Sequence, residues 1–312
     1  MLTLAKYALK GQYQAATVVG ILAIVAVFFP LVAGTTFISA LVTTVLIVMS
    51  GALVGLIILT QGTISGLKAI IVSILGITLV TWIVLKAPSL GISIALAQWL
   101  PIVILAHTLK STKSLAMMIL AGAALATGVA GIQFYAVPDL EAEWLTVIQL
   151  SMEQLQGNPA YSSVVVRDNI QLFVHWMVLL MVPAMYLLFV SILHLSRWLQ
   201  ARVAGSDGYN QEFRAIALGK PAAIFAVAVL ILSFWLNQDW ISSMALIVMA
   251  AFLYQGVAVV HSRAVRSKYR AWMIGFFYAL LLLFPQVVAL TSIVGVIDNW
   301  LVFRKNRNIE ST

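Results

Sequence analysis

Long stretches without a single charged side chain are the feature of this chain that most limits how it can fold. Residues 37–59 and 115–136 contain no Asp, Glu, Lys or Arg, and about 20 consecutive apolar residues are enough to span a bilayer as a helix. Over the 312 residues, 62% are hydrophobic and 9% are charged, whereas soluble domains are about 25% charged. So little polar surface cannot cover a water-soluble core. The chain is therefore predicted to be an integral membrane protein.

Eight apolar stretches are predicted to cross the membrane as helices, because a backbone in hydrocarbon must satisfy its hydrogen bonds internally. A ninth stretch, residues 272–303, would be about 48 Å long as one helix, which is too long for one upright span. The expected fold class is an all-α, polytopic transmembrane bundle of about eight to ten spans, forming one integral membrane domain over residues 1–312. The eight stretches are residues 15–33, 37–59, 67–85, 90–108, 115–136, 170–195, 220–237 and 240–261.

The Lys and Arg residues predict the orientation, since they are enriched in cytoplasmic loops. With the N-terminus in the cytoplasm, Lys86 and Arg167 are the only cations before the C-terminal tail that fall on the outer side. Residues 137–169 then form an extracytoplasmic loop, and residues 196–220 form a cytoplasmic loop. The net charge of +8 reflects this topology, and no nucleic-acid partner is expected. The cations placed inside are Lys6, Lys10, Lys68, Lys110, Lys113, Arg197, Arg202, Arg214, Lys220, Arg263, Arg266, Lys268 and Arg270.

The last apolar stretch ends in a tail with Arg304, Lys305 and Arg307, which favour the cytoplasm. Pro285 lies near the middle of the stretch and would break or kink a helix. Two short helices around Pro285 that return the tail to the cytoplasm are predicted in preference to one long tilted helix. Asp298 is expected at an interfacial helix end, paired with a cation of the tail.

Two segments outside the spans have patterns of their own. In residues 139–157, Trp144 and Ile148 share one helical face with acidic residues opposite, which predicts an amphipathic helix lying on the outer membrane surface or covering the bundle as a lid. In the cytoplasmic loop, residues 212–220 predict a short helix that ends before Pro221. This loop is either solvated or a docking surface for a cytoplasmic partner.

Motifs of soluble enzymes are missing from the sequence. There is no Gly-x-x-x-x-Gly-Lys-Ser/Thr phosphate loop, and the clustered acids, His or nucleophile of general acid–base catalysis are also missing. The four His residues are far apart in the sequence and Cys is absent, so no metal site and no other cofactor are predicted. The chain is not expected to be an enzyme, and no catalytic residue is assigned.

Uncharged polar residues inside the apolar stretches are the candidates for ligand contact. A Gln within a span either hydrogen-bonds to a neighbouring helix or lines a pocket for a neutral ligand. Gln98-Trp99-x-Pro101 is the most suggestive group, because an amide beside an aromatic ring suits a flat ligand. His175 is the clearest titratable residue within a span, and either bonds to a neighbouring helix or has a function. The ligand-binding candidates are Gln98, Trp99, Gln133, His175, Gln255 and Gln286.

Small residues four apart mark close helix contacts, because they let two backbones approach. Gly51-x-x-x-Gly55 and Ala16-x-x-x-Gly20 have this spacing. The partner helix is either in the same chain or in another membrane subunit.

Three blocks of sequence resemble the YybS-like family of multi-span bacterial membrane proteins: GYNQEFRAIALGK (208–220), YQGVAVVHSRAVR (254–266) and LLLLFPQVVALTSIVGVIDNW (280–300). The family has no established activity and is distantly similar to the substrate-binding S subunits of energy-coupling-factor vitamin transporters and to a cell-shape membrane protein. The resemblance implies a helical bundle in the bacterial cytoplasmic (inner) membrane. By analogy with S subunits, it also implies that Ala16 and Gly20 meet a transmembrane partner.

Two functions are compatible with these features. The first is a subunit that binds or transports a small, largely neutral solute and depends on a separate ATPase or membrane partner for energy. The scarcity of carboxylates within the spans disfavours a proton- or sodium-driven carrier. The alternative is a non-transporting scaffold of envelope or cell-shape machinery. Besides the lipid bilayer, protein partners are expected at Ala16, Gly20, Tyr209, Glu212, Phe213 and Lys220.

Overall fold

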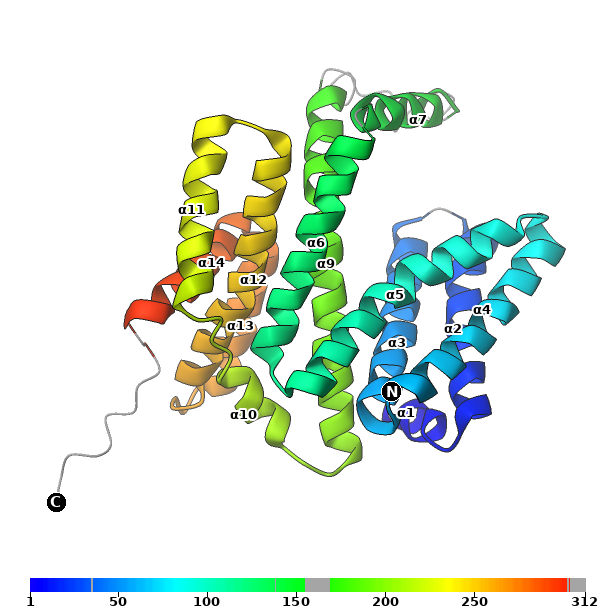
Figure 1. Cartoon of the computed structure of the whole chain (residues 1–312), viewed down its shortest axis with the longest axis horizontal. Coiled ribbons are helices and arrows are strands. Elements are labelled where there is room, and N and C mark those ends of the chain that lie inside the picture. Colours follow the sequence, from blue (N-terminus) through cyan, green and yellow to red (C-terminus); the bar gives the residue numbers. More distant parts are fainter. Residues whose placement is uncertain (35, 138, 155–168, 302, 304–312) are drawn as a thin grey trace. The chain divides into compact units, whose positions relative to one another are not determined.

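The predicted spans are helices in the computed structural model, which describes residues 1–34, 36–137, 139–154, 169–301 and 303. All regular secondary structure in these ranges is helical (Figure 1). The helices are α1 (Leu2–Ala8), α2 (Gln12–Ala33), α3 (Phe37–Gln61), α4 (Thr63–Leu85), α5 (Pro88–Thr112), α6 (Leu115–Ala136), α7 (Leu140–Gln154), α9 (Ile170–Val203), α10 (Gly208–Arg214), α11 (Lys220–Leu236), α12 (Asp239–Ala264), α13 (Arg270–Leu283) and α14 (Pro285–Leu301).

The all-helical class is confirmed. Within the described residues, seven helices are long and apolar enough to cross a membrane: α2, α3, α4, α5, α6, α9 and α12. The remaining predicted span, residues 220–237, corresponds to α11. This helix has 17 residues, or about 26 Å, slightly short of a hydrocarbon core of about 30 Å.

The described chain divides into two compact units. Unit 1 contains Met1–Gly122 and Leu188–Ile216, and unit 2 contains Ala123–Leu187 and Ala217–Thr312. Two of the boundaries lie inside α6 and α9, and the third lies between Ile216 and Ala217, in the segment that joins α10 to α11. The sequence predicts one membrane domain, because a boundary within a continuous apolar helix leaves no change in composition.

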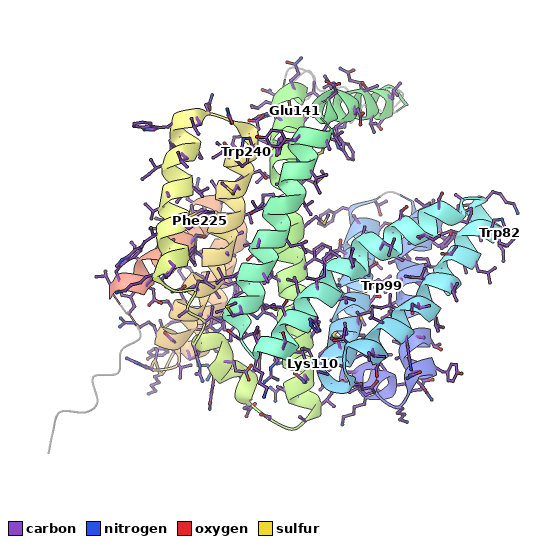
Figure 2. All side chains as sticks on the ribbon, viewed as in Figure 1. Trp82, Trp99, Lys110, Glu141, Phe225 and Trp240 are labelled. Atoms are coloured by element: carbon purple, nitrogen blue, oxygen red, sulfur yellow. The ribbon has the colours of Figure 1, made fainter. Side chains whose placement is uncertain are left out.

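Unit 1 is built around α3. Helices α2 and α5 both contact α3 and α4, and the second half of α3 is buried from Ser50 to Leu59. Gly51 and Gly55 face Ile192 and Ser196 in the last part of α9, so this glycine pair makes a contact within the chain. Trp82 and Lys110 mark opposite ends of the unit (Figure 2). These ends are called the Trp82 end and the Lys110 end below.

Unit 2 is built around α12, which contacts α11, α13 and α14. The closest approach is between α12 and α14. A Cβ atom at Gly256 would overlap the carbonyl oxygen of Thr291, and one at Gly295 would overlap the carbonyl oxygen of Phe252. Only glycine at these two positions allows the backbones to lie so close together.

The predicted break in the last apolar stretch is present. Phe284 has an extended backbone between α13 and α14, and the two helices are bent by 117°. Pro285 has no N–H group to continue α13, yet it is well suited to the first position of α14. The tail cations 304, 305 and 307 lie outside the described residues.

The two segments outside the spans differ in how well they were predicted. Helix α7 occupies most of the segment for which an amphipathic helix is predicted, and residues 155–168 lie outside the described residues. In residues 196–220, the prediction of a helix over 212–220 is wrong, because α10 covers Gly208–Arg214 instead. Gly219 has a φ of +91°, a conformation that ends helical structure before α11 begins.

The α12–α14 contact predicts an asymmetry between two glycine-to-alanine substitutions. Gly256→Ala should destabilise the protein by about 1–3 kcal/mol, because the new methyl group overlaps backbone atoms that cannot move aside. Gly275→Ala on α13 is the matched control, since a Cβ there meets no atom within 4 Å and alanine favours helix by about 1 kcal/mol. Thermal unfolding in detergent, followed by tryptophan fluorescence, measures both. Equal stability of the two variants would contradict the close approach.

Candidate functional site

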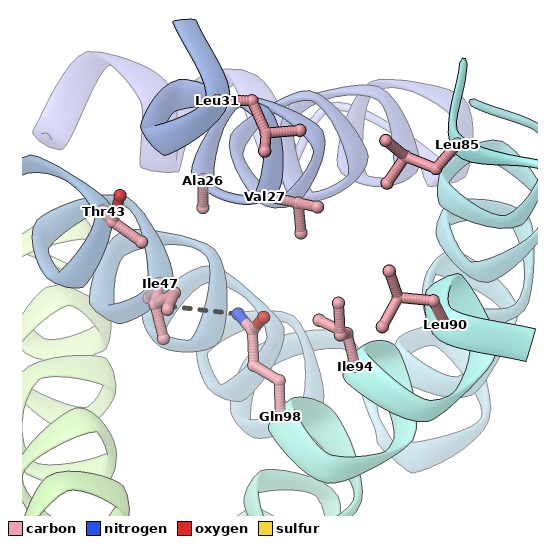
Figure 3. Close-up of a pocket in the computed structure, with 9 residues that line it drawn as sticks. All are labelled: Ala26, Val27, Leu31, Thr43, Ile47, Leu85, Leu90, Ile94 and Gln98. Atoms are coloured by element: carbon pink, nitrogen blue, oxygen red, sulfur yellow. Dashed lines mark hydrogen bonds between the residues drawn. The ribbon is translucent and has the colours of Figure 1, made fainter. Parts of the chain in front are cut away.

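A cavity of about 350 Å³ lies between α2, α3, α4 and α5 near the Trp82 end of unit 1. It lies where α2 and α4 end and α3 and α5 begin. The walls are apolar apart from two side chains, Thr43 and Gln98 (Figure 3). The lining residues are Ala26, Val27, Leu31, Thr43, Ile47, Leu85, Leu90, Ile94 and Gln98.

Gln98 is the polar lining residue on α5, and it lies farther from the start of that helix than the other α5 residues of the lining. Its Nε2 atom donates a hydrogen bond to the carbonyl oxygen of Ile47 at 3.3 Å, and its amide oxygen points away from Ile47, on the side of Val27 and Ile94 (Figure 3). Since α5 begins at Pro88, Gln98 lies about 15 Å along the helix, or roughly half-way across a hydrocarbon core. The donor side of the amide is therefore used to hold α3, and the acceptor side is presented to the cavity.

Two further polar groups lie at the cavity wall. The Thr43 hydroxyl oxygen is buried and has no hydrogen-bond partner among the described residues. Pro30 lacks the N–H that would otherwise bond to the carbonyl of Ala26, which is a lining residue. The Thr43 hydroxyl oxygen is itself buried, so the Gln98 amide oxygen is the polar group that a bound molecule would meet in an otherwise apolar site.

Of the predicted Gln98–Trp99 group, Gln98 lines the cavity and Trp99 does not. Trp99 is 1% exposed and does not line the cavity. Its Nε1–H donates to the Ser50 hydroxyl at 3.3 Å, and that hydroxyl donates to the carbonyl of Val19 at 3.2 Å. Trp99 therefore joins α5, α3 and α2 beneath the cavity and supports its floor.

The remaining Gln candidates have different environments. Gln133 is buried and donates from Nε2 to the carbonyl of Val178 at 2.9 Å, which links α6 to α9 in unit 2. Its amide oxygen is buried without a partner in the described part of the chain. Gln286 is exposed, so the prediction that it is a polar residue buried in a span is wrong. Pro285 places it in the first turn of α14.

Gln255 is at the centre of a buried polar network in unit 2. It is 0% exposed. Its amide oxygen accepts from the backbone N–H of Leu218 at 2.9 Å, and its Nε2 donates to the Asp298 carboxylate at 2.9 Å. Beside it, the N–H of Gly219 donates to Asn299 Oδ1 at 3.0 Å. The three blocks that carry the family resemblance therefore meet at this network.

Asp298 lies in the last turn of α14, at a helix end as the sequence predicts, and the tail cations expected to pair with it lie outside the described residues. Its side chain is buried, with the residue 5% exposed, and it accepts hydrogen bonds from Gln255 and from the backbone N–H of Phe303. The sequence places Asp298 near the end of an apolar stretch, which is typical of an interface. Only the return of α14 across α12 brings the carboxylate into the interior.

His175 belongs to a cluster that the sequence does not predict. Its Nδ1 atom lies 2.9 Å from Glu141 Oε1 and 3.9 Å from Asp239 Oδ2. The three residues come from α7, α9 and α12 and all belong to unit 2. Because the two carboxylates precede and follow His175 at long range in sequence, no local spacing could have identified the group.

The partner-binding candidates are mostly engaged within the chain. Ala16 and Gly20 are buried against α4, where the Ser73 hydroxyl donates to the Ala16 carbonyl at 3.0 Å. They are therefore not at a free surface. Lys220, by contrast, is exposed.

The three candidates on α10 hold this helix against α9. Glu212 forms a two-point ion pair with Arg197. The Tyr209 hydroxyl lies 3.3 Å from His194 Nδ1, and the Phe213 ring contacts the His194 ring edge-on. These three side chains therefore have a positioning role in unit 1, whatever else they bind.

A groove at the Lys110 end is lined by four charged residues of unit 1. It has a volume of about 380 Å³ and is lined by Leu59, Leu109, Lys110, Lys113, Arg197, Gln200 and Glu212. The Lys110 ammonium donates to the carbonyl of Ile58 near the end of α3, and Gln200 donates to that of Leu59. Three cations face one carboxylate, so the groove is suited to an acidic group.

No protein-family model, no curated protein and no solved structure matches the chain. The class of protein is defined by the helices themselves. It is an all-helical membrane protein with seven long apolar helices among its described residues.

The Gln255 network predicts how strongly one amide supports unit 2. Gln255→Leu should lower the free energy of unfolding by about 1–3 kcal/mol, because it leaves the Leu218 N–H and the Asp298 carboxylate without this partner. Gln286→Leu is the control and should change stability by about 0.5 kcal/mol or less, since Gln286 is exposed. Thermal unfolding in detergent distinguishes them. A Gln255→Leu variant as stable as Gln286→Leu would show that the network is dispensable.

Proposed function

We propose that the protein is a membrane subunit that binds a small, largely apolar and neutral solute in the cavity of unit 1 and depends on a separate energising partner. The observation that carries the proposal is the cavity between α2, α3, α4 and α5 with Gln98 at its inner part. Its volume of about 350 Å³ is within the range of small-molecule sites. The YybS-like family, which three sequence blocks resemble, is distantly similar to substrate-binding S subunits, and this agrees with such a role.

The lining defines the chemistry of the solute. No charged side chain lines the cavity, so an ionic group would lose its hydration without compensation. Apolar side chains surround most of the space, and the Gln98 amide oxygen supplies an acceptor. A compact, mostly hydrocarbon molecule with one hydroxyl or amide N–H donor would satisfy it.

The proposed orientation places the cavity toward the outside of the bacterial inner membrane. Lys6, Lys10, Lys110 and Lys113 belong to α1, the turn after it and the end of α5, all at the Lys110 end. The preference of cations for the cytoplasm assigns this end to the inside. The Trp82 end, with the cavity, then faces outward, where a solute would be captured.

The energising partner is proposed to dock at the Lys110 end. The chain has no nucleotide-binding loop, and the groove with Lys110, Lys113 and Arg197 presents positive charge there. An acidic surface of a cytoplasmic ATPase would complement this groove.

Filling the cavity tests solute binding. Val27→Trp should block the site, whereas Leu75→Trp on α4 should not, because Leu75 is 65% exposed and does not line the cavity. Protein purified in mild detergent from native membranes is analysed by mass spectrometry of its small-molecule extract. We expect a compound that is present with wild type and the Leu75→Trp variant and depleted at least about tenfold with Val27→Trp. The proposal would be rejected if the depleted compound were bulk phospholipid, or if no compound depended on the cavity.

Charge reversal tests partner docking. Lys113→Glu should weaken recovery of a co-purifying ATPase about tenfold, a loss of about 1.4 kcal/mol, because it places like charge opposite an acidic surface. Lys268→Glu, in the exposed turn before α13, is the control. Quantitative affinity purification from membranes measures both variants, and equal recovery would argue against the groove.

The alternative, a non-transporting scaffold, is distinguished by the opposite pattern. A scaffold requires the cytoplasmic loop surface, with Lys220 and α10, and makes no use of the cavity. Partner recovery would then fall in Phe213→Ala and persist in Gln98→Ala, with no cavity compound in wild type. Solute capture predicts that Gln98→Ala depletes the compound.

A further inference from the structure

Glu141, His175 and Asp239 bring three metal-ligating atoms together at one end of unit 2. These atoms, one from each side chain, all lie within 4.8 Å of one another. Glu141 is in the first turn of α7 and Asp239 begins α12, while His175 lies in the second turn of α9. We infer that the three side chains bind a divalent transition-metal ion such as Zn²⁺ or Mn²⁺.

The donor set suits such an ion. One imidazole nitrogen and two carboxylate oxygens are ligands that Zn²⁺, Mn²⁺ and related ions accept at about 2.0–2.2 Å. Ligand atoms around one ion are then about 3–3.5 Å apart, so the Glu141–His175 distance of 2.9 Å already fits. The 3.9 Å from His175 to Asp239 closes with a small side-chain rotation, because Asp239 is half-exposed.

Charge balance points the same way. The two carboxylates bring negative charge together in a small volume, and like charges at this separation repel. Within the described residues, neither carboxylate forms an ion pair with Lys or Arg; each is paired with His175 alone. A divalent cation neutralises both carboxylates, which is especially favourable near the low-dielectric membrane.

The surrounding helices hold the ligands in place. Next to Asp239, the Trp240 ring contacts Tyr135 at the end of α6, with ring centroids 5.9 Å apart. Glu141 and Trp240 lie at the same end of unit 2 (Figure 2). The site is therefore surrounded by the long helices α6, α9 and α12, which pack in unit 2. Helix α7 is anchored near its start by Glu141. A bound ion would tie the beginning of α7 to α9 and α12.

The metal site is independent of the proposed solute site. The cluster lies wholly in unit 2, and the cavity lies wholly in unit 1. Failure of one proposal therefore leaves the other standing.

Metal binding by the full chain tests the inference. Purified protein in detergent is stripped with chelator, dialysed against Zn²⁺ or Mn²⁺, and its metal content is measured by mass spectrometry. Mn²⁺ paramagnetic resonance provides a second readout. Wild type should bind one equivalent. Glu141→Gln, His175→Gln and Asp239→Asn should each weaken metal binding by at least about tenfold. Removing a residue that only supports a metal ligand costs about this much, so removing a ligand should cost at least as much. Glu143→Gln, on the same turn of α7 and outside the cluster, is the control and should bind as wild type does.

Unfolding temperatures separate a metal site from a plain ion-pair cluster. Ligation predicts that Zn²⁺ raises the unfolding temperature of wild type and of Glu143→Gln but not of the three cluster variants. Asp239→Asn keeps the His175–Glu141 hydrogen bond, so it serves where the other variants fold poorly. Lack of metal binding by wild type, or unchanged binding by His175→Gln or Asp239→Asn, would overturn the inference.

Discussion

Helices surrounded by lipid gain little by burying apolar side chains against one another, because the lipid tails are equally apolar. Their association must come from close backbone packing and from polar groups that have no better partner. In unit 2, Gly256 and Gly295 allow α12 and α14 to touch at the backbone. In unit 1, side chains of α3, α4 and α5 reach across to carbonyls of neighbouring helices, as Ser73 does to Ala16 and Gln98 to Ile47. The positions of the site residues depend on these few contacts.

The same constraint explains why the cavity can select a solute. Several buried polar atoms within unit 1 join helices, as the Trp99–Ser50–Val19 series shows. At the cavity, the acceptor side of the Gln98 amide remains. A site with so few polar groups favours an apolar ligand and uses them to orient it. Specificity then rests on shape as much as on hydrogen bonds.

The two units have a different balance of charge and polarity. The network of Gln255, Asp298 and Asn299 secures the loop before α11, where the N–H groups of Leu218 and Gly219 would otherwise lack a partner. A buried carboxylate is costly in a membrane, and here backbone and amide donors stabilise it. The cluster around His175 carries carboxylates at a more exposed place, where an external cation can reach them. Unit 2 thus combines a structural polar core with a proposed ion site, and unit 1 provides the cavity.

The sequence by itself determined the all-helical class, the long apolar helices and the break at Pro285, because hydrophobicity and the missing N–H of proline act locally along the chain. It also identified Gln98 and Gln255 as unusual, since an amide in an apolar stretch is conspicuous without any partner. The tertiary structure alone decided that Gln98 borders a cavity while Trp99 does not, that Asp298 is buried, and that Glu141 and Asp239 meet His175. Each of these outcomes depends on which helices become neighbours. That choice is made by backbone approach and hydrogen bonding between residues far apart in sequence, which leave no periodic pattern along the chain.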